Sequence, residues 1–196
     1  MILPIVLYGD PVLRKVCKPV DQLNSDIKKL VENMFETMNT AKGVGLAAPQ
    51  VGVPIRIFII DPSQYEDEQN PDGKDLLKSF KRVFINPVLS EEHSRETVFN
   101  EGCLSLPGIR EDVKRKSTIT VSYCDENFVQ KTESFEGLPA RIILHEYDHI
   151  QGILFTDRIN PLRKRLLQRK LNEISKGITD VHYKIKLPAK TKKITV

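Results

Sequence analysis

Five residues, His145-Glu146-Tyr147-Asp148-His149, constrain this chain more than any other stretch. On an α-helix, side chains four positions apart lie one turn above each other, so both imidazoles can bind one divalent metal ion. The carboxylate of Glu146 then lies within reach of a metal-bound water. Pro139 stands near the start of the predicted helix and Gly152 follows its end, as is typical of helix boundaries. The pattern predicts a metal-binding helix, and two surface histidines on an amphipathic helix are the alternative.

A catalytic metal site usually takes three protein ligands, so this motif needs a partner from elsewhere in the chain. Cys103 follows a glycine and precedes Pro107, which favours a shaped loop or the end of a strand. Its thiolate is the candidate third ligand. Without the histidine pair, a buried and unreactive cysteine would be the better interpretation. The chain has three cysteines, an odd and small number that does not suggest a disulfide framework.

Length and composition predict one soluble domain of 196 residues, with 40% hydrophobic and 29% charged residues. No apolar run reaches the length of a membrane span, and the first residues lack the features of a signal or transit peptide. We therefore expect a cytoplasmic protein without a membrane partner. From residue 160 to 196, eleven lysines and arginines stand against two acids. Such a basic end favours contact with a polyanion, and a solvated helix face with a solvated tail explains it about as well.

The remaining patterns predict a mixed succession of elements. Apolar residues at helical spacing predict a helix over 25–41, and a second, basic helix is expected over 161–176. Residues 43–50 are rich in glycine and alanine and are expected to form a loop that lies close to a ligand. Strands are expected over 55–61, 82–89, 117–124 and 128–135, the last two as an antiparallel hairpin. Residues 62–80 are interpreted as a surface insertion.

Three stretches now stand in order: Gly43 to Gln50, Glu101 to Ser105, and His145 to His149. In this order and spacing they resemble the three signature motifs of the peptide deformylases, and the resemblance extends from about residue 5 to 175. It implies an enzyme that removes the N-formyl group from the first methionine of nascent chains, here in a bacterial cytoplasm. It also implies an α+β fold with antiparallel β-sheets around a central metal-binding helix. We expect a single catalytic domain over 1–177 and a basic C-terminal tail over 178–196.

The resemblance implies a role for individual residues. The expected metal ligands are Cys103, His145 and His149. Catalysis is expected from three groups: the Glu146 carboxylate as general base and acid, and the Gln50 amide and Leu104 backbone N–H as donors to the oxyanion. Substrate contacts are expected from Gly45, from Arg110 near the cleft mouth, and by position from a methionine pocket of Val44, Leu138 and Ile142. We also expect Asp148 and Arg115 to form a pair that supports the metal helix, and a solvated Asp148 is the alternative.

Cysteine and histidine ligands suit zinc, whereas the resemblance implies Fe(II) as the physiological ion, with zinc, nickel or cobalt able to substitute. The expected partners are N-formylmethionyl nascent peptides and, through the basic C-terminal region, the ribosome. Two other classes use the same features differently. A zinc metalloprotease would take a downstream ligand, for which His182 is available. A metal-stabilised RNA-binding protein would use the basic end and leave Glu146 without a role, while a purely structural metal knot lacks a fourth ligand.

Overall fold

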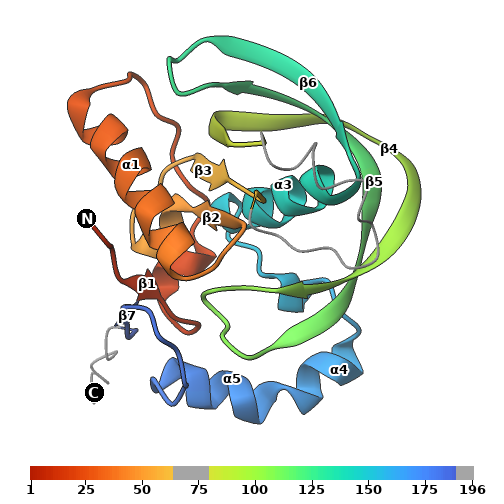
Figure 1. Ribbon diagram of the computed structural model, residues 1–196. Coiled ribbons are helices and arrows are strands. Elements are labelled where there is room, and N and C mark those ends of the chain that lie inside the picture. Colours follow the sequence, from red (N-terminus) through yellow and green to blue (C-terminus); the bar gives the residue numbers. More distant parts are fainter. Residues whose placement is uncertain (64–79, 189–196) are drawn as a thin grey trace, which may run out of the picture.

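The computed structural model describes residues 1–63 and 80–188. Helix α3, Gly137–Ile150, lies at the centre of the molecule, with strands β4, β5 and β6 curving around it (Figure 1). Ten of its fourteen residues are buried, including both histidines of the motif. An amphipathic surface helix exposes one face, whereas a helix that is buried nearly all round belongs to the core. The alternative of two surface histidines is therefore wrong.

The main sheet is antiparallel and has five strands in the order β2-β3-β4-β5-β6. Their bounds are Gly45–Ala47, Ile57–Ile60, Arg82–Gly102, Arg110–Cys124 and Gln130–Glu136. Alternate residues of β5, namely Ile119, Val121 and Tyr123, point inward, as the period-2 pattern predicts. They pack on the α3 side chains Ile143 and Leu144. The expected α+β fold, with antiparallel strands around the metal helix, is confirmed.

A second, smaller sheet joins the two ends of the chain. Strand β1, Ile5–Val6, pairs in parallel with β7, Ile185–Lys186. Both strands lie beside helix α5, close to the N-terminus (Figure 1). Between β1 and α1 the chain forms a short 3-10 helix, Pro11–Arg14. The C-terminal segment therefore packs on the first strand of the protein.

Helix α1, Ser25–Thr40, agrees with its prediction. The Asn24 side chain accepts a hydrogen bond of 2.9 Å from the Ile27 N–H and so satisfies one free donor at the helix start. Met34 and Met38 are fully buried in a core cluster with strand β3. The hydrophobic stripe of this helix is core, as its spacing predicts.

Three expectations need correction. Residues 43–50 are not a loop throughout, because Gly45–Ala47 forms edge strand β2 and Ala48–Val51 a 3-10 helix. The strand from Arg82 continues to Gly102 rather than ending at residue 89, because register shifts absorb the irregular stretch around Pro87. The basic helix is two helices, α4 at Pro161–Leu166 and α5 at Gln168–Ser175. A further 3-10 helix, Phe155–Asp157, connects α3 to them. The expected insertion over 62–80 lies almost wholly outside the described residues.

Candidate active site

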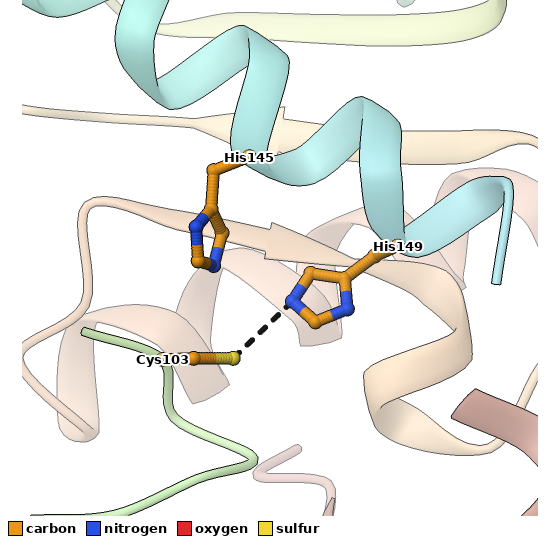
Figure 2. A group of neighbouring side chains, drawn as sticks. All are labelled: Cys103, His145 and His149. Carbon is orange, nitrogen blue, oxygen red and sulfur yellow. Dashed lines mark hydrogen bonds between the residues drawn. The ribbon is translucent and has the colours of Figure 1, made fainter. Parts of the chain in front are cut away.

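Helix α3 and the loop after β4 bring three soft ligands together. His145 and His149 project from successive turns of α3 toward Cys103, which follows the end of β4 (Figure 2). The Cys103 Sγ atom lies 3.2 Å from the His149 Nε2 atom. One donor atom from each residue lies within 4.8 Å of the other two. The three residues expected as ligands from the sequence thus form one cluster.

The cluster has the geometry and charge of a metal site. Donor atoms bonded to one metal ion at roughly 2.0–2.3 Å lie about 3–4 Å from each other, and the 3.2 Å between Cys103 Sγ and His149 Nε2 falls in this range. Burial lowers the pKa of His145, but hydrogen bonds to Cys103 and Glu101 outweigh burial and raise this pKa to about 10. The surroundings therefore favour positive charge at this point. A divalent cation can supply that charge in place of a proton.

Glu101 fixes the orientation of the first histidine. Its Oε2 atom accepts a hydrogen bond of 2.9 Å from the Nδ1 atom of His145, which leaves Nε2 to face the cluster. Burial alone would raise the pKa of Glu101, but hydrogen bonds from His145 and Arg115 hold it well below its ordinary value. Glu101 is therefore a carboxylate. Sequence reasoning placed Glu101 in a motif without giving it a role, and its position two residues before Cys103 was the available signal.

A buried ion network lies behind the histidines. Arg115, whose side chain is 2% exposed, donates to both carboxylate oxygens of Glu101 at 2.7 and 2.9 Å. It also donates to Asp148 Oδ2 at 2.7 Å, so the expected Asp148–Arg115 pair is confirmed. Arg141 bonds to Glu101 at 3.2 Å and Arg158 bonds to Asp148, two contacts that the sequence did not predict. The network ties β4, β5 and α3 together around the cluster.

Glu146 lies buried beside the cluster and against strand β2. Burial raises the pKa of its carboxyl to about 7. Within the described part of the chain, its Oε2 atom has no hydrogen-bond partner. A Cβ atom at Gly45 would lie 2.5 Å from Glu146 Oε1, so only glycine leaves room for the carboxylate. The second glycine of the Gly-Val-Gly stretch is therefore explained by the close approach of Glu146.

Two potential hydrogen-bond donors face the same space. Gln50 Oε1 accepts a bond of 2.7 Å from the Ala47 N–H, which directs Nε2 toward Cys103 Sγ at 3.5 Å and Ser105 Oγ at 3.4 Å. The Leu104 N–H follows Cys103 directly, and no acceptor for it is found among the residues described here. The Leu104 N–H is therefore available to a ligand, whereas the Gln50 amide would exchange one of its two long hydrogen bonds for a ligand.

A cleft of about 430 Å³ opens onto these groups. Its lining includes all the residues expected to contact substrate: Val44, Gly45, Arg110, Leu138 and Ile142. Arg110 lies at the exposed rim, where its side chain donates to the Asn100 side-chain and backbone oxygens at 2.9 and 2.6 Å. Val181 and Tyr183 also line the cleft, although they belong to the expected tail. No sequence motif pointed to them.

A cysteine and two histidines, beside a buried glutamate and an apolar cleft, define a metal-dependent hydrolase. A family model described as polypeptide deformylase matches residues 2–165. The chain is 55% identical over 194 residues to a peptide deformylase of Flavobacterium johnsoniae, covering 98% of this chain and 99% of that relative. It is 52% identical to one of Christiangramia forsetii, covering 96% and 97% of the two chains. A crystal structure of a peptide deformylase from Legionella pneumophila aligns with a TM-score of 0.76 at 36% identity, covering 90% of this chain and 96% of that chain.

The chain belongs to the polypeptide deformylase family. It is thus a metal-dependent hydrolase that removes the N-formyl group from nascent peptides. The protease and RNA-binding alternatives are set aside on this ground. Across residues 1–63 and 80–188, no helix has the length and apolar character needed to cross a membrane.

Proposed function

We propose that deformylation here depends on Glu146 as general base and acid, with Cys103, His145 and His149 as the metal ligands. The observation that carries this assignment is the buried Glu146 carboxylate beside the three ligands, with one oxygen free to take a proton. A pKa raised by burial to about 7 suits a group that must accept and release a proton near neutral pH. We also propose residues 1–177 as one catalytic domain, to which the first residues of the 178–196 segment add part of the cleft.

A divalent metal ion held by Cys103, His145 and His149 would supply positive charge next to the formyl oxygen and would make the attacking water more acidic. Glu146 accepts the proton of that water through Oε2 as the new C–O bond forms at the formyl carbon. The Gln50 amide and the Leu104 N–H donate to the oxygen that gains negative charge. Glu146 then gives the proton to the amide nitrogen, the C–N bond breaks, and formate and a free N-terminal methionine leave.

The cleft supports a place for the methionine next to the reacting group. Val44, Leu138 and Ile142 are apolar and share the cleft lining with His145 and Glu146. Arg110 is anchored at the rim by Asn100, where its guanidinium can meet the backbone of an entering peptide. Gly45 offers backbone without a side chain at the edge of the sheet.

The deciding measurement is formate release from formyl-Met-Ala-Ser by anaerobically prepared protein. Glu146→Gln keeps the shape of the side chain and removes the base, so we expect release to fall at least about 10²-fold while metal content stays unchanged. Glu36→Gln on α1, which makes the same change far from the cleft, serves as the matched control. Full activity of a metal-loaded Glu146→Gln protein would overturn the proposed role.

We propose Fe(II) as the physiological ion. A thiolate and two imidazoles suit both iron and zinc, and the resemblance to other deformylases favours iron. Elemental analysis of protein purified without oxygen, alongside activity after iron, zinc, nickel or cobalt loading, tests this. Stoichiometric zinc in a fully active anaerobic preparation would contradict it.

We propose that the enzyme works in the bacterial cytoplasm and meets its substrate at the ribosome through helices α4 and α5. They expose basic residues such as Arg165 and Arg169, and Lys176 follows directly after α5. For electrostatic binding to a polyanion, the logarithm of the affinity falls linearly with the logarithm of the salt concentration. Each lost cation reduces the slope of this line by about one. In co-sedimentation with ribosomes, Arg165→Glu should reduce binding and its salt slope, whereas Lys28→Glu on α1 should not. Equal binding by both variants would refute the contact.

A further inference from the structure

The C-terminal segment, residues 178–188, returns from α5 to the catalytic cleft. Gly177 follows α5 with φ +78°, and a Cβ there would meet the Leu187 side chain at 2.5 Å. Only glycine allows this close reversal of the chain. Strand β7 then pairs with β1 through bonds of 2.8 Å from the Ile5 N–H and 3.1 Å from the Leu7 N–H. The segment is therefore anchored by its backbone, independently of Tyr183.

Tyr183 points from this segment toward the turn that carries Cys103. Its hydroxyl donates a hydrogen bond of 2.8 Å to the backbone oxygen of Leu104. Burial raises the pKa of the phenol to about 12, so the hydroxyl remains a donor in solution near neutral pH. The ring is half-buried and lines the cleft. Tyr183 thus contacts the catalytic loop instead of the hydrophobic core.

In the turn after β4, three successive backbone carbonyl oxygens each accept a hydrogen bond from a different donor. The Cys103 oxygen accepts from the Leu106 N–H at 3.0 Å, which closes the turn. The Ser105 oxygen accepts from the Tyr8 N–H at 2.9 Å. The oxygen between them, that of Leu104, is bonded by the Tyr183 hydroxyl. This bond restrains the Leu104–Ser105 peptide plane, which adjoins the plane that carries the Leu104 N–H, in a residue that lines the cleft.

We propose that Tyr183 is a positioning residue for deformylation, which holds the Leu104 turn so that its N–H points at the reacting oxygen. This inference rests on the proposed role of the Leu104 N–H. A donor to a developing charge acts only when its direction is fixed in advance, because reorganisation during the reaction cancels its benefit. The Tyr183 bond supplies that restraint from the opposite end of the chain.

Tyr183→Phe removes the hydroxyl and keeps the ring in the cleft wall. We expect kcat to fall about tenfold, part of the roughly 10²–10³-fold cost of losing such a donor completely. KM should change less than about twofold, because the donor acts on the transition state more than on the bound substrate. Tyr123→Phe is the matched control, since its phenol also donates a partly buried hydrogen bond, of 2.9 Å to Glu133, away from the cleft. It should lose stability and leave kcat unchanged.

Two measurements decide the outcome. The first is the kcat and KM for formyl-Met-Ala-Ser of both variants, and the second is amide hydrogen exchange across residues 103–106. We expect faster exchange in this turn for Tyr183→Phe alone. Wild-type kcat with unchanged exchange in that variant would overturn the proposal. A rise in KM alone would also overturn it, because Tyr183 would then only line the substrate cleft. A Leu104→Pro protein lacks the N–H in question. If it is fully active while Tyr183→Phe still shows faster exchange, Tyr183 restrains the turn but the proposed role of the Leu104 N–H is refuted.

Discussion

The substitution Glu101→Gln tests how the buried network supports the metal cluster. Both carboxylate oxygens of Glu101 accept two hydrogen bonds each. Oε1 receives Arg115 and Arg141, and Oε2 receives Arg115 and His145. A glutamine has one oxygen and one NH₂ group, so in either orientation its NH₂ faces two N–H donors. No rotation of the new side chain can relieve this conflict.

The magnitude follows from burial. Glu101 is 4% exposed and Arg115 2%, so removing the negative charge leaves a buried cation with Asp148 as its remaining partner. Breaking a buried ion pair from one side costs about 3–5 kcal/mol of unfolding free energy. The charge that strengthens the hydrogen bond orienting His145 is also lost, and disruption of such a partner typically lowers metal affinity about 10–100-fold. We expect both losses in Glu101→Gln.

Glu111→Gln is the matched control, because Glu111 faces Glu101 across the β4–β5 ladder. Its partner Arg163 is 60% exposed, so water can replace the lost interaction. Urea unfolding of the metal-free proteins measures stability, and competition with a chelator measures metal affinity. The reasoning is refuted if Glu101→Gln binds metal as tightly as the wild type, or if the two variants lose equal stability.

Three further results are expected. Gly45→Ala should lower formate release by about 10²-fold or more, because the added Cβ displaces the Glu146 carboxylate. Normal turnover by this variant would contradict the steric argument. Burial alone would raise the pKa of Asp157, but hydrogen bonds from Arg14 and Lys164 lower it to about 2. Ionised Asp157 therefore contributes its full stabilisation above about pH 4, and this stabilisation is lost toward pH 2. The substitution Asp157→Asn should remove about 1 kcal/mol of the acid-dependent change in unfolding free energy, after allowance for solvent screening. Burial raises the pKa of the Cys17 thiol to about 11, so mass spectrometry should find Cys17 unmodified by iodoacetamide in native protein at about pH 8.

The parts of the molecule that sequence predicted best have strong local signals. The α1 stripe and the β5–β6 hairpin obey helical and strand periodicity. The metal helix was predicted from two histidines four residues apart. Cys103 became the candidate third ligand because the histidine pair needed one, and the resemblance to a family supported it, since a single cysteine has no periodic signal of its own.

The unpredicted parts depend on contacts between distant residues. Strand β2 begins at a glycine, Gly45, and its pairing with β3 rather than its own sequence makes it a strand. The length of β4 depends on register shifts against β5. Arg141 and Tyr183 reach the site across 40 and 79 residues to Glu101 and Leu104. No local pattern encodes such pairs.

The parallel pairing of β1 with β7 has a consequence for biosynthesis. Of the strands in residues 1–63 and 80–188, β1 is synthesised first and β7 last. Contacts between residues so distant in sequence carry the largest loop-closure entropy and form late. Val181 and Tyr183 therefore take their places in the cleft only after β7 has been made and can pair with β1. The cleft of each new copy of the enzyme is complete only from that point on.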